Sequence, residues 1–478
     1  MSALLSVSGI VFPLITFPYV ARVLSTDSLG KVNFAVSVIA YFMMFAQLGI
    51  PTYGIRACAR VRDNKEKLSK TVQELFIINM ITDAVVYIAL AVCINIIPKL
   101  VENKELVLIV SITIFLNSIG MEWLYEALEE YVYITIRSIA FKTIALIAMF
   151  FIITSEDDFI LYGIYSIFAS SASNIINFIH ARKYINVKPV GGYNLKRHLK
   201  SVIVFFAMSC ATTIYTNLDT IMLGFMKTDE EVAFYNSAVK IKILLVAVVT
   251  SLGTVLLPRL SYYIEHDMIE DFRKTCKKAL NFVFLLALPL TVYFIYFAKN
   301  GILLFAGDKY YNSILPMQII MPTVIFIGIT NILGIQILIP LGKEKIVLYS
   351  EIAGAIVDFG LNLLFIPRFG AAGAALGTLA AEIVVLIIQL LYLKDSIADA
   401  FKEVQYIKIF IAIVAGAFAS FWVVLLELSN FFTVLVSAAL FFSAYLTVLI
   451  LTKEKLSIEL TEQLINRLKK TTSDDSNL

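Results

Sequence analysis

Several charged side chains lie inside long apolar stretches of this sequence, where a charge is costly. Arg137 and Lys142 fall in the apolar run 131–154, about 9 and 16 Å from its first residue at a rise of about 1.5 Å per residue. An ionisable group at such a depth needs a partner or a water-filled cavity. We therefore expect a cationic cavity that attracts a phosphate-bearing substrate. The structural alternative is a set of buried ion pairs that only fix helix packing.

A second basic pair, Lys240 and Lys242, lies in the run 232–257. Residues two apart on a helix point about 200° apart, so at most one of the two faces a central pathway directly. Arg22 lies at the end of the first run, where an arginine also reaches lipid headgroups without any functional role. The predicted substrate-binding residues are Arg22, Arg137, Lys142, Tyr215, Asn217, Tyr235 and Lys240.

Oxygen-bearing side chains in the second half of the chain suggest a site for a coupling ion. Asp358 and Asn362 are four residues apart and therefore share one face of a helix. Thr378 and Asp219, on other runs, are expected to face them. Such a set suits Na⁺, or a carboxylate carries H⁺. Polar packing between helices is the alternative. No other metal and no cofactor is expected.

The elements that position these residues are membrane-spanning helices. With 59% apolar and 16% charged residues and a mean hydropathy of +0.85, the chain suits lipid rather than water as its solvent. Bends are expected at Pro13 and Pro18 in the first span and at Pro316, Pro322 and Pro340 around the tenth. We predict an all-α membrane protein of about 14 spans, with no cleaved signal peptide and no separate soluble domain. The predicted spans are 2–24, 32–50, 71–97, 106–125, 131–154, 159–179, 199–225, 232–257, 279–297, 314–339, 346–366, 371–393, 407–428 and 431–451.

This pattern divides into two sets of six spans followed by two more, which suggests an internal duplication. The predicted domains are an N-lobe (1–181), a linker (182–198), a C-lobe (199–394), the last two spans (395–452) and a tail (453–478). Loops on one side carry 27 Lys and Arg residues, against 8 on the other. Because basic loops stay cytoplasmic, both termini are expected in the cytoplasm.

Enzyme signatures are missing from the sequence. It has 3 His, no phosphate-binding loop, no zinc pair and no nucleophile elbow. The external loops are also too short for a catalytic domain. We therefore expect a protein that is not an enzyme, has no catalytic residues and binds no nucleic acid.

Five segments together resemble one family across nearly the whole chain. They are Pro18–Leu24 (PYVARVL), Glu122–Tyr131 (EWLYEALEEY), Asn217–Gly224 (NLDTIMLG), Pro340–Lys343 (PLGK) and Ile366–Ala375 (IPRFGAAGAA). The sequence resembles the Wzx-type polysaccharide flippases of the multidrug/oligosaccharidyl-lipid/polysaccharide exporter (MOP) superfamily. The resemblance implies two six-helix lobes in a V, two further helices, and alternating access through a cavity lined by spans 1, 2, 7 and 8.

The resemblance also implies a function. Family substrates are oligosaccharide units linked to undecaprenyl diphosphate, so the expected cationic cavity would meet a pyrophosphate. Implied partners are membrane lipids, a polysaccharide polymerase and glycosyltransferases, with the protein a monomer in the bacterial inner membrane. A multidrug or metabolite exporter of the same superfamily is the alternative, because fold does not decide substrate. Drug exporters favour acidic, aromatic cavities, whereas this chain places Arg and Lys within its spans.

Two departures from the family pattern bear on these expectations. In related sodium-coupled lipid II flippases a cation site lies among spans 7, 11 and 12, where Asp219, Asp358, Asn362 and Thr378 are similarly placed. The amide and carboxylate of span 11 stand in the opposite order here, which leaves Na⁺ and H⁺ both open. Family members also have a basic stretch before span 1, whereas Met1 almost begins the helix here.

Overall fold

The structure is a computed structural model that describes residues 2–459, and within this range it is built from helices and short connections without any β-strand. The chain forms two compact units. The first unit comprises Met1–Asn236, Ala306–Lys309 and Asn362–Ala374. The second comprises Ser237–Phe305, Tyr310–Leu361 and Ala375–Leu478. Of the predicted tail 453–478, residues 460–478 lie outside the described range.

The first unit holds most of the residues discussed below. Its helices follow the apolar runs of the sequence. They are α1 (Ser2–Val23), α2 (Thr26–Gln47), α3 (Ile50–Ala59), α4 (Lys65–Ile96), α5 (Pro98–Glu102), α6 (Lys104–Gly120), α7 (Glu122–Ala127), α8 (Tyr131–Ile152), α9 (Phe159–Ser171), α10 (Ser173–His180), the 3₁₀ turn η1 (Ala181–Lys183) and α11 (Lys196–Met226). α12 (Asp229–Glu265) begins here and continues into the second unit.

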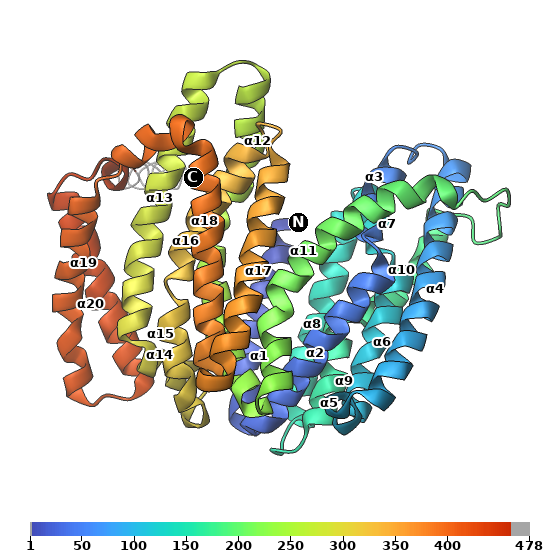
Figure 1. Ribbon diagram of the computed structural model, residues 1–478, viewed down its shortest axis with the longest axis horizontal. Helices are drawn as coiled ribbons and strands as arrows, with labels where there is room; N and C mark the ends of the chain where they lie inside the picture. The colour runs from blue at the N-terminus through green and yellow to red at the C-terminus, as the bar shows by residue number, and fades with distance from the viewer. Residues whose placement is uncertain (1, 460–478) are drawn as a thin grey trace, which may run out of the picture. The chain divides into compact units, whose positions relative to one another are not determined.

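The second unit contains the rest of the chain. Its elements are α13 (Ile269–Tyr296), α14 (Ala298–Phe305), η2 (Asp308–Ser313), α15 (Ile314–Ile320), α16 (Thr323–Thr330), the π-helix η3 (Asn331–Leu338), α17 (Glu344–Phe369), α18 (Ala371–Lys402), α19 (Tyr406–Ser420), η4 (Phe421–Leu426) and α20 (Asn430–Leu451). Three of them, η2, α17 and α18, share residues with the first unit. α19 and α20 pack side by side (Figure 1).

Among the described residues, 12 helices are long and apolar enough to span a membrane, or 13 with one bent pair. That pair, Asp308–Ile320 and Thr323–Leu338, bends by 45°. The break falls beside Pro322, which confirms the bend predicted there. The all-α membrane fold is confirmed, but the count of 14 is not. The one predicted span that is in neither the 12 helices nor the bent pair is 2–24, which coincides with the 22-residue helix α1.

Breaks inside two predicted spans of the first unit have a local cause. Leu48 and Gly49 both have positive φ, 47° and 72°, and they separate α2 from α3. A Cβ on Gly49 would also lie 2.5 Å from the backbone of Phe205 on α11. Glycine is therefore required there both for the turn and for the close approach of α11. Likewise Met121, with φ 41°, separates α6 from α7.

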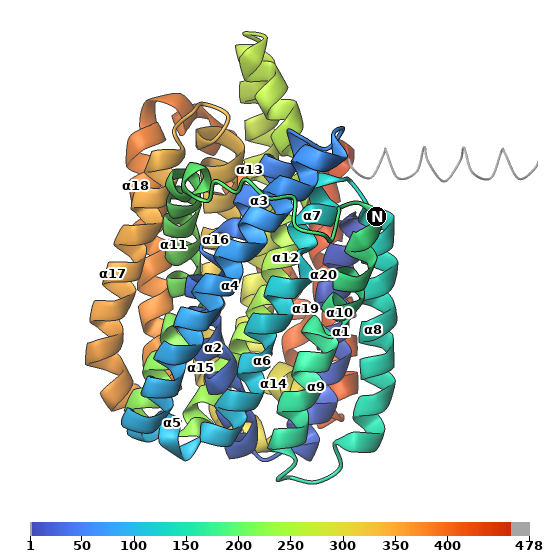
Figure 2. The same cartoon turned by 90° about the vertical axis from the view of Figure 1, so that its right-hand side faces the viewer.

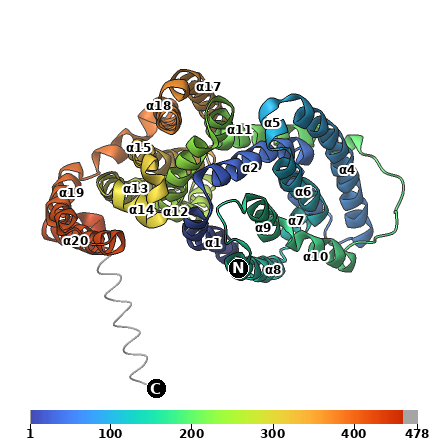
Figure 3. The same cartoon turned by 90° about the horizontal axis from the view of Figure 1, so that it is seen from below.

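α2 packs along α11 and against α4 and α6, and Figure 2 shows α2, α4 and α6 running next to one another. Aromatic rings join α2 to α11, with the Phe34 and Phe225 ring centroids 5.2 Å apart. Gly224 of α11 leaves the room that the Phe34 ring occupies. Seen from below, α9 lies among α2, α6 and α8 (Figure 3), and it contacts all three.

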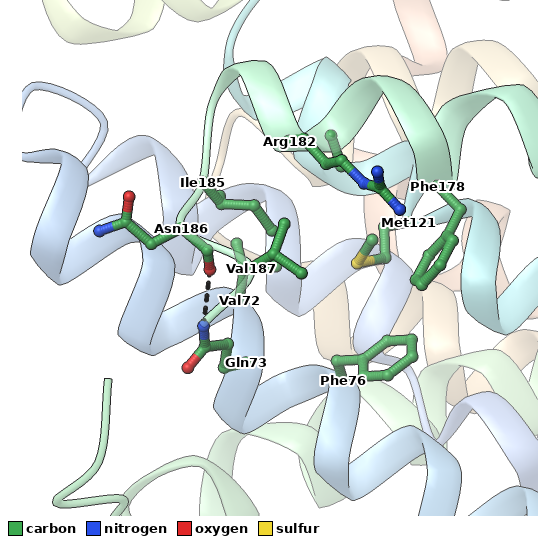
Figure 4. A pocket seen from close by; sticks show the side chains of 10 residues that line it. Val72, Gln73, Phe76, Met121, Phe178, Arg182, Ile185, Asn186 and Val187 are labelled. Atoms are coloured by element: carbon green, nitrogen blue, oxygen red, sulfur yellow. Dashed lines mark hydrogen bonds between the residues drawn. The ribbon is translucent and has the colours of Figure 1, made fainter. Parts of the chain in front are cut away.

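The linker after η1 is docked on α4 through one glutamine. The Gln73 amide nitrogen donates to the carbonyl oxygens of Asn186 at 2.7 Å and Lys188 at 3.0 Å. Its amide oxygen accepts from the Val190 nitrogen at 3.1 Å and from the Tyr193 hydroxyl at 2.7 Å. Figure 4 shows Gln73 reaching the linker at Asn186. The backbone groups of Asn186, Lys188 and Val190, which no helix pairs, thereby find their hydrogen-bond partner in the Gln73 side chain.

Candidate functional site

Asp219 brings three of the predicted residues together. This α11 carboxylate is 6% exposed. Its Oδ2 accepts a short hydrogen bond from the Tyr235 hydroxyl of α12, and its Oδ1 accepts from the Asn362 amide of α17 at 2.6 Å. All three side chains belong to the first unit. The predicted coupling residues Asp219 and Asn362 are thus in contact, and Tyr235, predicted to bind substrate, contacts the same carboxylate.

The other two predicted coupling residues, Asp358 and Thr378, belong to the second unit. Both side chains are buried. Asp358 stands one turn before Asn362 on the continuous helix α17, so the spacing argument from the sequence applies to a helix that the structure contains.

Arg137 of α8 is buried at 7% exposure, and its Nη2 lies 3.2 Å from Oε1 of Glu122 on α7. Its Nε and Nη1 have no hydrogen-bond partner among the described residues. The Glu122 side chain is 44% exposed. A buried guanidinium with two unused donors is costly to keep and remains able to bind an anion.

Lys142, five residues further along α8, is half-buried and reaches a different neighbour. Its Nζ donates to the Ser8 hydroxyl of α1 at 3.1 Å. Five residues turn a helix through about 140° beyond a full circle, so the two cations leave α8 in different directions. Arg137 pairs with Glu122 of α7 and Lys142 donates to Ser8 of α1, and the Glu122 carboxylate acts electrostatically on both cations.

The remaining predicted substrate residues are spread over both units. On α11, Tyr215 is half-buried, and the half-buried Asn217 bonds locally to the Thr213 carbonyl and the Thr216 hydroxyl. Arg22 is exposed at the end of α1 and donates to the Pro18 carbonyl at 2.6 Å. Lys240 and Lys242 are both half-buried and belong to the second unit.

A polar cavity of about 230 Å³ lies inside the first unit, and sequence reasoning missed it. Its lining residues are mostly amides and carboxylates from five helices and the start of α3. They are Gln47, Pro51, Asn79, Asn117, Glu122, Trp123, Glu126 and Asn174. The sequence does contain an indication of the cavity, because four amide side chains interrupt apolar runs. Amides carry no formal charge, however, so they stand out less than charged residues do. Glu122 and Glu126 were used only as letters of a motif.

A second missed cluster surrounds Glu74 of α4, whose side chain is 0% exposed. Its carboxylate accepts from the Asn194 backbone nitrogen at 2.7 Å, from Arg197 Nε at 2.8 Å and from Nε2 of His198 at 2.8 Å. The other ring nitrogen of His198 pairs with the Tyr53 hydroxyl at 2.8 Å. The cluster fixes the start of α11 to α3 and α4.

A further cavity of about 230 Å³ lies where the linker crosses α4 (Figure 4). Its lining is mainly apolar, with Phe76 and Phe178 on one side and Arg182 at the edge. Just beyond it, burial and a hydrogen bond to Glu130 raise the pKa of Tyr184 to about 12, so this phenol stays protonated. Among the described residues, no three His, Cys, Asp or Glu side chains are grouped to hold a metal ion.

Comparison with known proteins decides the family. The model described as "Polysaccharide biosynthesis protein" matches residues 1–264, which is more than half of the chain. The chain belongs to this family. A second model, MatE, matches residues 204–364. Membership confirms the resemblance to the Wzx-type flippases of the MOP superfamily and, with the apolar helices, a multi-pass membrane protein related to transporters.

Two curated relatives of this family member carry the name "Putative O-antigen transporter". The protein from Escherichia coli (strain K12) is 23% identical over 397 residues, covering 81% of this chain and 94% of the relative. The protein from Shigella dysenteriae is 26% identical over 400 residues, covering 79% of this chain and 95% of the relative.

Two solved structures share the fold. A lipid II flippase MurJ in an inward closed conformation gives a TM-score of 0.66 at 18% identity, covering 93% of this chain and 99% of that one. An inward-facing multidrug resistance MATE family transporter of the MOP superfamily gives 0.65 at 15% identity, covering 82% and 96%. At these identities the likeness concerns the fold alone.

Proposed function

We propose that this family member flips an oligosaccharide linked to undecaprenyl diphosphate from the cytoplasmic to the outer leaflet of a bacterial cell membrane, for cell-surface polysaccharide synthesis. The observation that carries the proposal is the family match over residues 1–264, the part of the chain that contains Arg137 and Lys142. The two O-antigen transporter relatives, covered over nearly their whole length, support it.

The chemistry of the first unit agrees with an anionic substrate. Arg137 keeps two donors unused inside the protein, and Lys142 makes one neutral hydrogen bond. Each cation can therefore take part of a diphosphate without breaking a strong ion pair. The proposed mechanism is alternating access, with both termini in the cytoplasm.

Complementation tests this function. In a bacterial strain that lacks its own O-antigen transporter, the chain should restore surface polysaccharide, seen as a ladder on a lipopolysaccharide gel. Lys142→Ala should abolish that ladder at unchanged expression, and Lys142→Arg, which keeps the charge, should retain most of it. Normal export by Lys142→Ala would contradict the role of Lys142.

A coupling ion is part of the proposal. Asp219, with Asn362 beside it, would bind Na⁺ or H⁺ with different affinity in the two transport states, and Asp358 and Thr378 are the other residues expected to affect coupling. In proteoliposomes, Asp219→Asn and Asp358→Asn should uncouple flipping from ion gradients. Wild-type flipping rates in both variants, indifferent to Na⁺ and H⁺ gradients, would remove the coupling site from these residues.

A multidrug or metabolite exporter is the second candidate, favoured by the MatE match over residues 204–364. Efflux of cationic dyes from cells that express the chain, without restored polysaccharide, would support it.

The proposed partners of the flippase are membrane lipids, a polysaccharide polymerase and glycosyltransferases, and the proposed state is a monomer. Co-purification from cross-linked membranes tests these partners.

A further inference from the structure

The polar cavity of the first unit presents more hydrogen-bond acceptors than donors. Asn79 is 4% exposed and lines the cavity, and its Oδ1 accepts no hydrogen bond among the described residues. Its amide nitrogen is already used, donating to the Ser118 hydroxyl at 3.1 Å. Glu122 and Glu126 add carboxylate oxygens. A buried acceptor without a hydrogen-bond partner is costly, so the cavity favours a ligand that carries hydrogen-bond donors.

The cavity walls are held in place by close packing. Asn174 of α10 donates to Oδ1 of Asn117 at 2.9 Å, and Gly120 of α6 provides the space in which Asn174 lies. Gly54 of α3 lies against one face of the Trp123 ring, where a Cβ would be 2.7 Å from a ring carbon. The amides and the indole are therefore fixed before any guest arrives, which lowers the entropy cost of binding.

Size and charge exclude a bare metal ion as the best guest. A hard cation needs about six to eight oxygens at roughly 2.3 to 2.6 Å, which a cavity of about 230 Å³ would leave far apart. No group of three acidic, His or Cys side chains forms here or elsewhere among the described residues. Glu122 also forms an ion pair with Arg137, which weakens its attraction for a cation.

A sugar ring matches what remains. Its hydroxyl groups donate to amide and carboxylate oxygens and accept from amide nitrogens, and its C–H face packs on an aromatic ring. At about 230 Å³ the cavity is smaller than the roughly 300 to 1,000 Å³ of pockets for drug-sized ligands, which suits one ring rather than an oligosaccharide. We propose that this cavity is a saccharide-binding subsite of the first unit, which holds one sugar of the transported oligosaccharide. The inference rests on the proposed function.

The location of the cavity fits substrate loading. Gln47 is the last residue of α2, and Glu122 and Trp123 begin α7. Both places border the end of the unit that carries the basic segment 53–70, which the charge pattern assigns to the cytoplasm. The exposed side of Glu122 leaves the cavity reachable from outside the unit.

Occupancy can be read directly, because the chain has only 2 Trp, Trp123 and Trp422. In a Trp422→Phe protein, Trp123 is the single tryptophan and its emission reports on the cavity. Free glucose, galactose, N-acetylglucosamine and rhamnose, titrated separately at millimolar levels, are the probes. At least one should shift the emission saturably, and Asn79→Leu or Glu126→Gln should remove the shift. A shift caused by NaCl but by none of the sugars would overturn the proposal, as would no saturable shift at all.

Transport gives the second arm. Asn79→Leu and Glu126→Gln should each lower flipping of the lipid-linked oligosaccharide at least tenfold, whereas Asn95→Leu, the same change on an exposed part of α4, should not. If Asn79→Leu fails to fold, the milder Glu126→Gln decides. Wild-type flipping in the folded variants would overturn the subsite alone. Absence of flipping by the unmodified protein would instead overturn the proposed function.

Discussion

Glu74 and Arg137 are both buried charges of the first unit, yet their surroundings differ. Glu74 receives hydrogen bonds from a backbone nitrogen, an arginine and a histidine, and so is fully satisfied. Arg137 has one partner at 3.2 Å and two donors unused among the described residues. A satisfied buried charge fixes structure, whereas an unsatisfied one keeps binding capacity at a cost in stability. The comparison separates framework from candidate site.

The largest expected effect is on the satisfied side. Glu74→Leu should cost about 3 to 5 kcal/mol, because it removes the hydrogen bonds that one buried carboxylate accepts from the Asn194 nitrogen, Arg197 and the buried His198. The measurement is the melting temperature of the purified protein, with folded yield as a second readout. Glu74→Gln, which keeps the size and part of the hydrogen bonding, is the matched control. Its melting temperature should lie between those of the unmodified protein and Glu74→Leu. An unchanged melting temperature in Glu74→Leu would break the comparison.

Asp219 should behave as an intermediate case. Tyr235→Phe removes one hydrogen bond to a buried carboxylate and should cost about 1.5 to 3 kcal/mol. Because the same carboxylate is the proposed coupling group, the ion dependence of flipping should change as well. A drop in melting temperature with unaltered ion dependence would assign Asp219 to the framework.

Arg137→Met should change stability by no more than about 1 kcal/mol in either direction, because an apolar side chain of similar length avoids the cost of the unused donors. Export of polysaccharide should nevertheless be lost. The two readouts are the melting temperature and complementation. A destabilisation as large as that of Glu74→Leu, with export retained, would reverse the assignment of the two regions.

The smallest effect is expected at an exposed pair. Arg62 and Glu129 form an ion pair at 2.8 Å in the connections outside the spans. Water and salt screen such a pair, so Arg62→Ala should leave both melting temperature and export unchanged. This variant serves as the baseline for the other three, and a clear loss of export would point to a role for this surface in substrate capture.

The sequence was sufficient for the all-α membrane fold and for most of the spans, because an apolar run of about 20 residues has few alternatives to a transmembrane helix. It also located Arg137 and Lys142, since a charge within such a run stands out. It did not identify their partners, Glu122 and Ser8, which come from other helices. Which face of α8 meets which neighbour depends on packing that no periodicity within one helix encodes.

The breaks at Leu48 and Met121 were missed for a related reason. Both are apolar residues with positive φ, so hydropathy gives no sign of the turn. The cavity was missed because its amides are neutral and come from helices far apart in sequence. Conversely, the pairing of Asp219 with Asn362 was predicted. Carboxylate and amide groups are rare inside spans, and they form hydrogen bonds with each other there because the apolar surroundings offer few other partners.

The docked linker has a consequence for cutting the chain. Gly191 and Gly192, both at positive φ, lie between Val190 and Tyr193, both of which donate to Gln73. A protease that cuts the linker should therefore cut at this glycine pair, while Val190 and Tyr193 on either side stay bound to α4. A gene divided at that codon pair would yield an N-terminal fragment that keeps its own linker in place, so co-expressed halves have a defined edge at which to reassemble.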